Sequence, residues 1–381
     1  MANTLTSLIP DAYAALDVVS REMVGFIPSV MRDPSADRVA INQTLRSPYT
    51  SANTAGGNIT PAMAFPAAAY QTIGNKSLTI TKQRFWPFSW TGEEQYSLDQ
   101  GPGALTIEQD QIAQAMRAGV NEMEADIYAA AYAGGSRAYG TVGTIPFTTN
   151  LAESAQIRKI LDDNGAPSSG RSAVITTTTG AQMRTLAQLT KANEAGTTMG
   201  LRDGEILNIN GISFKESAGV TSVTAGAMTG ALFNGAGAVG DTTITYDTGT
   251  VNTTGLVAGD VITVGSFKYV VATGTTATSG TFTIQAPGLR AVVADNTAIT
   301  VVATGARNVA FSSNAIVLAT RLPMTPKGGD LAIGREIITD PRSGISFELV
   351  AYPGIDMITY HVRACWGVTV FKPEHVAILL E

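Results

Sequence analysis

The chain has 381 residues, 44% hydrophobic and 15% charged, so it is long enough for two or three domains and too apolar for an intrinsically disordered protein. Its 31 acidic residues outnumber the 25 basic ones, and the net charge of −6 excludes a surface built mainly to neutralise phosphate. A single cysteine, Cys365, excludes intrachain disulfides and cysteine-based metal cages.

The start of the chain has no basic leader followed by an apolar run, and no stretch reaches 18 consecutive apolar residues. We therefore expect a protein that is made and stays in a cytoplasm, with no membrane segment. Residues 1–33 mix short apolar clusters with prolines. This pattern predicts an extended arm with a short helix near residues 11–22.

Two segments with strand-type alternation come next, at residues 37–49 and 77–90, separated by a stretch rich in Ala, Gly, Asn, Thr and Pro. They predict a long two-stranded ribbon with a large tip. Two strands cannot bury a face on themselves, so the ribbon needs another surface. Trp86, Phe88 and Trp90 share one face, which we interpret as a core stripe at the ribbon base rather than a base-stacking platform, because basic neighbours are few.

The clearest helix signal begins at Thr106, where Gln109 completes a capping box. Apolar residues then recur at steps of three and four until Gly134 and Gly135. The pattern predicts an amphipathic helix over residues 107–133. Its core face is expected to consist of Ile112, Met116, Val120, Met123 and Ile127.

The next part of the chain is typical of α/β structure. We expect a helix at 151–162, a strand at 172–178, a helix at 180–190 and a hairpin whose Asn210–Gly211 pair suits a type I′ turn. Over residues 218–306 only 6 of 89 residues are charged, and short β-branched runs alternate with Gly and Thr clusters. That region predicts an inserted all-β sandwich or barrel.

The last part of the chain predicts more strands. Residues 314–321 and 335–352 are expected to be strands, with a turn at 340–344. From Ile358 to Val370 apolar residues alternate with others, which indicates a strand with one buried face. A buried strand, VAILL, follows.

Several residues and segments match patterns that occur in functional sites of other proteins. Gly235–Gly240 matches the dinucleotide-binding pattern, but the β-forming DTTITY follows where that motif needs a helix, so we interpret it as a loop. We interpret His361 and His375 as surface or interface residues and Cys365 as a small core or edge residue. Asp162 and Asp163 are expected to be solvated. Without a nucleophile elbow, phosphate loop or paired carboxylates, we expect no catalysis, cofactor or metal.

A large chain with an arm and a ribbon that cannot bury themselves needs burial from outside its own core. Symmetric self-association supplies it, because each copy carries both the projecting element and the accepting surface. Many modest contacts, repeated over a closed lattice, then stabilise the assembly. The sequence therefore predicts a shell subunit.

The order of elements resembles the major coat protein of tailed double-stranded-DNA bacteriophages with the Hong Kong phage capsid fold, most nearly the P twenty-two type coat family. The likeness spans nearly the whole chain except most of residues 218–306. Its segments include LTSLIPDAYAALDVVSREMVGFIPSV, AYQTIGNKSLTITKQRFWPFSWTGEEQ, TIEQDQIAQAMRAGVNEMEADI, LRDGEILNINGISFKESA, NVAFSSNAIVLATRLP, DPRSGISFELVAYP and GVTVFKPEH.

The resemblance implies an α+β fold with the following parts: an N-terminal arm (1–36), an extended loop (37–100), a peripheral domain (101–164 and 335–381) with a spine helix (106–134), an axial α/β domain (165–217 and 307–334) and an inserted β domain (218–306). The tip of the loop is expected to contact a neighbouring subunit through Thr54, Ile59, Met63, Phe65 and Tyr70.

The resemblance also implies partners. These are further copies in hexamers and pentamers, a scaffolding protein, a portal complex and enclosed double-stranded DNA bound without sequence specificity, in a virion capsid assembled in the host cytoplasm. Some relatives lock the shell by a lysine–asparagine isopeptide bond. Lys76 and Lys82 lie in the loop, but no asparagine follows Asn314, so we expect a shell without crosslinks.

Two alternatives stay open. A bacterial encapsulin compartment shares this fold but usually lacks such a β insert, and its particles would hold enzyme cargo rather than DNA. A cytoplasmic enzyme that binds a nucleotide through Gly235–Gly240 would bind a labelled dinucleotide.

Overall fold

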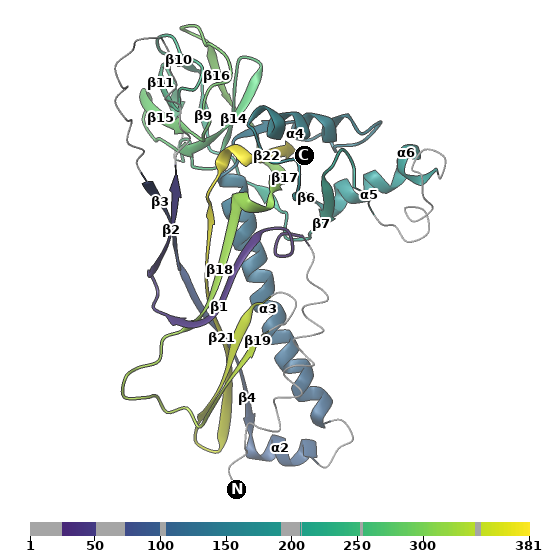
Figure 1. The fold of residues 1–381 in the computed structure, drawn as a ribbon, viewed down its shortest axis with the longest axis vertical. Helices are drawn as coiled ribbons and strands as arrows, with labels where there is room; N and C mark the ends of the chain where they lie inside the picture. The colour runs from purple at the N-terminus through teal and green to yellow at the C-terminus, as the bar shows by residue number, and fades with distance from the viewer. Residues whose placement is uncertain are drawn as a thin grey trace, which may run out of the picture.

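The computed structural model describes residues 25–50, 73–99, 104–191, 206, 208–251, 254–339 and 344–381. It is a mixed α/β structure with few helices and much sheet. Figure 1 shows one long helix, α3, along the length of the molecule, with sheet beside it and a group of short strands at one end. The expected helix at 11–22 lies outside the described residues.

Helix α3 (Ala104–Ala133) has 30 residues, which corresponds to about 45 Å. It begins before Thr106, so the expected capping box at Thr106 is wrong because that residue lies inside the helix. The backbone N–H of Gly134 still bonds to Ala130 O (2.8 Å), and the helix ends there. Its expected core-face side chains are all buried: Ile112, Met116, Val120, Met123 and Ile127.

A six-stranded sheet lies under α3, in the order β1-β18-β21-β20-β19, with β4 also paired to the long strand β21. Among the described strands of this sheet, β1 and β18 are the one parallel pair. Alternation places Tyr360, Val362, Ala364 and Trp366 in the main core with α3. The strands are β1 (Met31–Val39), β4 (Lys82–Thr91), β18 (Ile316–Pro323), β19 (Gly334–Thr339), β20 (Ser346–Pro353) and β21 (Met357–Val370).

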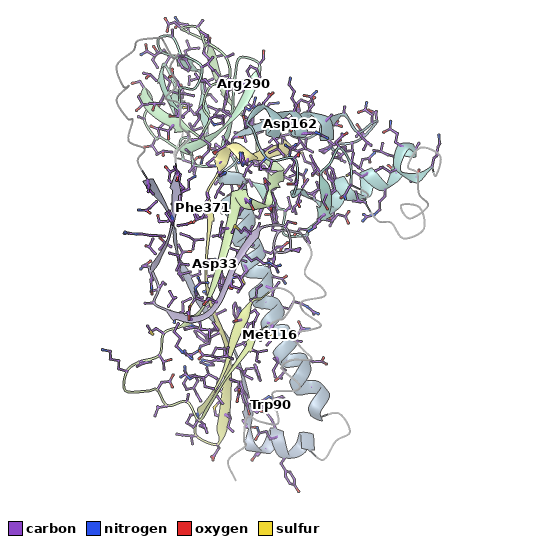
Figure 2. All side chains as sticks on the ribbon, in the orientation of Figure 1. Asp33, Trp90, Met116, Asp162, Arg290 and Phe371 are labelled. Atoms are coloured by element: carbon purple, nitrogen blue, oxygen red, sulfur yellow. The ribbon has the colours of Figure 1, made fainter. Side chains whose placement is uncertain are left out.

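Strand β4 corrects the predicted ribbon. Residues 82–91 pair with β21 over the whole register from Met357↔Thr91 to Trp366↔Lys82, so they belong to the main sheet. Trp86 stacks on Trp366 with ring centroids 6.1 Å apart, and Phe88 stacks on Tyr360 at 5.2 Å. The aromatic stripe is therefore a helix–sheet contact and not the base of a ribbon. Figure 2 labels Trp90 near the lower end of this contact and Met116 higher up α3.

Close packing at this contact depends on a glycine in the helix. A Cβ at Gly119 would lie 2.8 Å from the Trp86 ring. Helix α2 (Gly92–Asp99) follows β4 and begins with a reciprocal cap, in which Thr91 N–H donates to Glu94 (3.0 Å) and Glu94 N–H donates to the Thr91 hydroxyl (3.3 Å).

A larger sheet has twelve strands. Six of them, β10, β11, β13, β14, β15 and β16, pair in a closed antiparallel ring, because β13 bonds to both β14 and β16. The ring encloses its own hydrophobic cluster, which includes Phe233, Ile262 and Phe282. Its strands are β10 (Ala231–Phe233), β11 (Thr243–Asp247), β13 (Val261–Val264), β14 (Phe267–Thr273), β15 (Gly280–Ile284) and β16 (Ala298–Val301).

The ring continues through β14 into the order β5-β22-β17-β6-β7, with β8 paired to β17. These strands are β5 (Arg137–Tyr139), β6 (Arg171–Ile175), β7 (Ser213–Glu216), β8 (Ser222–Val223), β17 (Gly305–Ser312) and β22 (Val376–Leu380). Strands β9 (Met228–Thr229) and β12 (Thr250–Val251) form a separate pair. Short 3₁₀ turns at Ser313–Ala315 and Pro373–His375 precede β18 and β22.

Three helices pack near this sheet: α4 (Ala152–Asp163), α5 (Thr177–Thr185) and α6 (Ala187–Thr190). The expected single helix at 180–190 is thus two short helices, because Leu186 adopts an extended conformation between them. Thr176 caps α5 by accepting from the Thr179 N–H (3.0 Å). Asn210 and Gly211 have φ of 53° and 74°, as a type I′ turn requires.

A buried carboxylate links four strands of the smaller sheet. Glu348 on β20 is fully buried, and it accepts hydrogen bonds from Arg38 (2.5 Å), Arg335 (3.1 Å) and Arg363 (2.7 Å). Burial alone would raise the pKa of Glu348, but the arginines outweigh it and hold the pKa below its usual range. The cluster ties β1, at one edge, to β19, at the other.

Candidate assembly surface

A two-stranded ribbon projects from the molecule. Strand β2 (Thr44–Thr50) pairs antiparallel with β3 (Ile73–Thr79), from Thr44↔Thr79 to Thr50↔Ile73, and with no other strand in the described part of the chain. The ribbon exists, but its second strand is 73–79 rather than 77–90. The expected contact residues Thr54, Ile59, Met63, Phe65 and Tyr70 lie outside the described residues.

Most of the ribbon is open to solvent. In β2 every residue except Leu45 is exposed, and apolar side chains are among them: Tyr49 is 46% and Ile73 is 68% exposed. No other strand of the described ranges pairs with either outer edge, and such free edges form a template for pairing with another chain. A two-stranded ribbon in this state is marginal in water on its own.

The base of the ribbon is fixed to the sheet. Ile80 is buried, and Thr81 N–H donates to Trp366 O (3.2 Å). The Thr79 carbonyl oxygen lies 2.2 Å from the place a Cβ on Gly367 would take, so only glycine lets the ribbon cross β21 here. Leu78 and Val39 complete a small hydrophobic cluster at this base. The ribbon is thus held at its base, and Lys76 adds one contact farther along β3, to the Phe371 carbonyl.

A second set of exposed apolar side chains lies around edge strand β19. Leu331 is 81% exposed, and Ile333 precedes the strand with 53% exposure. Ile337 within β19 is also exposed, as is Ile355 in the turn after β20. Because β19 has only one sheet neighbour, its outer backbone edge is unpaired in the described structure. The chain therefore carries both a projecting ribbon and a separate apolar edge.

The two loop lysines are engaged. Lys76 donates to the Phe371 carbonyl. Lys82 pairs with Asp126 (2.7 Å) and Glu122 (3.3 Å) on α3. Burial lowers the pKa of Lys82, but these two carboxylates outweigh it, and the net result is a raised pKa. The Lys82 amine is therefore held in its charged, non-nucleophilic form.

The dinucleotide-like segment is a loop of the β ring, as expected. Gly235–Gly240 lies between β10 and β11 and no helix follows it. Its backbone N–H groups are used within the protein: Gly235 donates to Asp295 (2.8 Å) and Gly237 to Val293 O (2.9 Å). These donors are not directed at a ligand.

The two histidines differ. His361 is half-buried; it stacks on Phe85 (4.8 Å between ring centroids) and makes an edge-on contact with Tyr352 (5.1 Å). His375 is only 8% exposed within the single chain, so the expectation of a surface or interface residue is wrong; the 3₁₀ turn that contains it folds inward to start β22. Burial lowers the pKa of both histidines. Neither is part of a cluster that suits acid–base chemistry.

The remaining candidate residues are structural. Burial raises the pKa of Cys365 to about 12, so its thiol is protonated at neutral pH. Asp162 and Asp163 are not merely solvated: Asp162 pairs with Arg171 (2.7 Å), and Asp163 pairs with Arg137 and Arg290 (both 3.4 Å). These pairs were not predictable from the local pattern, because each arginine lies outside helix α4, on β5, on β6 or in the loop that follows β15.

Within the described ranges, no group of three or more His, Cys, Asp or Glu side chains could hold a metal ion. None of the helices in the described part of the chain combines the length and apolarity needed to cross a bilayer.

No family model and no curated protein matches the chain. Similar solved structures include one of Mycobacterium phage Che8 (15% identity, TM-score 0.47, covering 89% of this chain and 84% of that one) and the capsid of cyanophage P-SCSP1u (11%, 0.49, 93% and 88%). A virus-like particle from Pyrococcus furiosus is also similar (7%, 0.44, 97% and 98%). Phage capsids recur among these structures. At such identities and TM-scores the likeness assigns neither family nor function.

Proposed function

We propose that the protein is the major capsid protein of a tailed bacteriophage, and that copies of it assemble into an icosahedral shell. The observation that carries the proposal is the β2–β3 ribbon: it is anchored at its base, β2 is exposed at every residue except Leu45, and no other described strand pairs with either outer edge. Such an element is stable only against another surface. In a shell, a neighbouring copy supplies that surface.

The accepting surface is the region around β19. Its exposed apolar side chains, Leu331, Ile333 and Ile337, match the exposed Tyr49 and Ile73 of the ribbon in chemistry. Burial of about 100 Å² of apolar area contributes roughly 2.5 kcal/mol, so one such contact is weak and its repetition over a shell is strong.

We also propose the division of the chain given above. Helix α3 would be the spine of a peripheral domain, residues 165–217 with 307–334 the axial domain, and the closed six-strand ring the main part of a β domain inserted at 218–306. The closed ring favours this reading of the insert because it encloses a hydrophobic cluster of its own.

The proposed shell would have both a cargo and assembly partners. The shell would enclose double-stranded DNA without specific contacts, as a chain of net charge −6 favours confinement over tight binding. A scaffolding protein and a portal complex would act in assembly, which would take place in a host cytoplasm. We propose no catalytic activity.

Sedimentation and negative-stain electron microscopy of the purified protein, alone and with a scaffolding protein, test assembly. Closed particles are expected. A protein that stays monomeric under all conditions, with its ribbon protected from proteolysis, would overturn the proposal.

The contents of purified particles distinguish a phage capsid from an encapsulin-type compartment. Nuclease-protected DNA in purified particles supports the phage capsid, whereas a packaged enzyme without DNA supports the compartment. The nucleotide-binding enzyme has little support, because the backbone N–H groups of Gly235, Gly237 and Gly240 all bond within the protein.

A further inference from the structure

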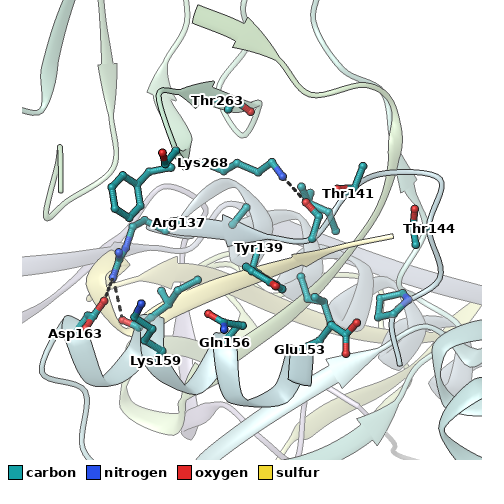
Figure 3. Close-up of a pocket in the computed structure, with 18 of the residues that line it drawn as sticks. Arg137, Tyr139, Thr141, Thr144, Glu153, Gln156, Lys159, Asp163, Thr263 and Lys268 are labelled. Carbon is teal, nitrogen blue, oxygen red and sulfur yellow. Dashed lines mark hydrogen bonds and ion pairs between the residues drawn. The ribbon is translucent and has the colours of Figure 1, made fainter. Parts of the chain in front are cut away.

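Two hollows of the described structure differ in character. The one beside Arg137, of about 550 Å³, lies between helix α4, strand β5 and the β13–β14 hairpin, and charged side chains line it (Figure 3). The other, of about 440 Å³, lies between strand β4 and the N-terminal half of helix α3, and we call it the β4–α3 groove. Its apolar lining residues are Trp86, Pro87, Phe88, Ile107 and Ala115.

The β4–α3 groove leaves apolar surface in contact with water. Trp86 and Phe88 pack toward α3, yet both stay only partly buried, and Ile107 is 42% exposed. Their stacking partners on β21, Trp366 and Tyr360, are buried. A contiguous apolar patch of this kind is typical of an interaction site. The groove can therefore receive an apolar side chain from another molecule.

The groove lies at one edge of the six-stranded sheet, and β19 lies at the other. Residues 358–363 of β21 pair with β20 and also with β4, so these two strands occupy opposite sides of β21. Strand β19 then follows β20, which gives the order β19-β20-β21-β4 in this part of the sheet. Surfaces at opposite edges can join one copy to the next in a head-to-tail manner.

Leu331 is an apolar side chain suited to such a groove. It is 81% exposed and lies in the loop between β18 and β19. Figure 1 shows this loop projecting to the left of the sheet, whereas the N-terminal half of α3 lies to its right. Ile337 lies within β19 itself, where a ribbon from a neighbour would pair. The loop therefore offers Leu331 to a further copy.

Hydrogen bonds hold the loop beside Leu331 in place. Arg335 Nη2 donates to both carboxylate oxygens of Asp330 (2.7 and 2.6 Å), and the Tyr352 hydroxyl donates to Oδ2 (2.8 Å). Arg363 in turn donates to the Tyr352 hydroxyl (3.0 Å). Arg335 and Arg363 both belong to the buried carboxylate cluster of the sheet. A loop fixed in this way loses little conformational freedom when it binds.

Charges near the two surfaces are complementary. Lys327 is exposed in the same loop as Leu331, and Asp110 is exposed at the rim of the groove. An opposite-charge pair at the rim of a contact favours one orientation of the partners over others.

We propose that Leu331 of one copy enters the β4–α3 groove of another copy, with Lys327 beside Asp110. The two surfaces differ, so the contact is heterologous and continues from copy to copy until it closes into a ring. The inference deepens the proposed function and rests on it in one respect, that copies of the chain associate.

Disulfide trapping between two variants tests the contact. Leu331→Cys and Gln114→Cys, which places a thiol at the exposed rim of the groove, are mixed, oxidised and run on a non-reducing gel. Cys365 does not compete, because burial raises its pKa to about 12. A heterodimer is expected. Each variant alone should yield roughly tenfold less dimer, because the contact raises the effective concentration of unlike surfaces only.

Ala181→Cys, exposed on α5, is the matched control for Gln114→Cys. Mixed with Leu331→Cys, it should give only the background of the single variants. Equal heterodimer yields with Gln114→Cys and Ala181→Cys would overturn the contact, as would a Leu331→Cys homodimer that exceeds the heterodimer.

A charge exchange tests the orientation. Lys327→Glu, added to the Leu331→Cys protein, should lower the heterodimer yield several-fold, and Asp110→Lys, added to the Gln114→Cys protein, should restore it. An unchanged yield with Lys327→Glu, or no recovery with both exchanges, would overturn the proposed orientation.

Maleimide labelling of Ala115→Cys, inside the groove, identifies the occupant. Protection that grows with protein concentration supports a second copy. Protection that is the same at every dilution would assign the groove to residues 1–24 of the same chain and overturn the proposal. Shells that form without the heterodimer would overturn this contact alone, whereas heterodimers without shells would overturn the proposed function and support the contact.

Discussion

The Oε1 atom of Glu124, on helix α3, accepts a hydrogen bond from the backbone N–H of Phe26 at 2.9 Å, although 98 positions separate the two residues. Its other oxygen accepts from Ile27 N–H (3.4 Å), and Ser217 Oγ donates to Oε1 (3.0 Å). The segment that begins at Gly25 is thereby fixed to the C-terminal half of the long helix. A Cβ at Gly25 would lie 2.4 Å from the same carboxylate oxygen.

Glu124→Ala removes an acceptor that two buried amides share. Leaving both without a partner should lower the free energy of unfolding by about 2–4 kcal/mol. Glu124→Gln keeps one acceptor oxygen and should cost less than half as much. Urea unfolding followed by circular dichroism measures both variants, and equal losses in the two would show that packing, not hydrogen bonding, accounts for the effect.

Charge on the buried face of α3 should abolish folding. Ile112 and Met116 are fully buried, so Ile112→Asp or Met116→Asp places an unpaired carboxylate in the main core at a cost above about 4 kcal/mol. Gln114→Asp, on the exposed face of the same helix, is the matched control and should fold normally. Soluble yield and thermal unfolding of the three variants provide the comparison.

Shortening the ribbon should separate folding from assembly. Thr50 and Ile73 are paired in register, so Asn-Gly in place of residues 51–72 closes the hairpin with a two-residue turn. The monomer should stay soluble and folded, while shells no longer form. Intact particles from this variant in electron micrographs would contradict the role given to the ribbon.

We expect the shell to lack covalent crosslinks. Lys82 is ion-paired and its pKa is raised, which disfavours the neutral amine that an isopeptide bond requires. Particles boiled in detergent should run as a single band of subunit mass on a gel. A ladder of multimers would refute this prediction, and Lys82→Arg would then show whether that lysine forms the bond.

Glu348 should make the protein sensitive to acid. Its pKa is lowered in the folded state, so its stabilising effect is present above the ordinary value of 4.5 and is lost as the pH falls through the lowered pKa. At pH 7, Glu348→Gln should cost about 3 kcal/mol, because three arginines lose their shared partner. The difference between wild type and variant should shrink below pH 4.5 in urea titrations, and a constant difference would contradict the assignment.

The sequence predicted elements whose pattern is local. Helix α3 was predictable because a buried helical face repeats every three to four residues, and β21 because its two faces alternate. The limits of the ribbon were not predictable, because the alternation over 77–90 is the same whether a strand pairs in a hairpin or in a larger sheet. Only the crossing at Gly367, which involves residues almost 290 positions from Thr79, separates β3 from β4.

Sites made from distant segments escaped prediction for the same reason. The cavity beside Arg137 is lined by β5, α4 and the β13–β14 hairpin, and no single stretch contains its pattern. The arginine cluster on Glu348 likewise comes from β20, β21, β19 and β1. His375 was misplaced because its neighbours Pro373 and Glu374 are typical of an exposed turn.

The six-strand ring has no edge left to pair, since every member already has two neighbours. It is therefore the part of the β structure least able to template growth onto another copy. Val239, in the loop between β10 and β11, is 61% exposed, so a foreign peptide inserted beside it would be displayed at the surface of the ring.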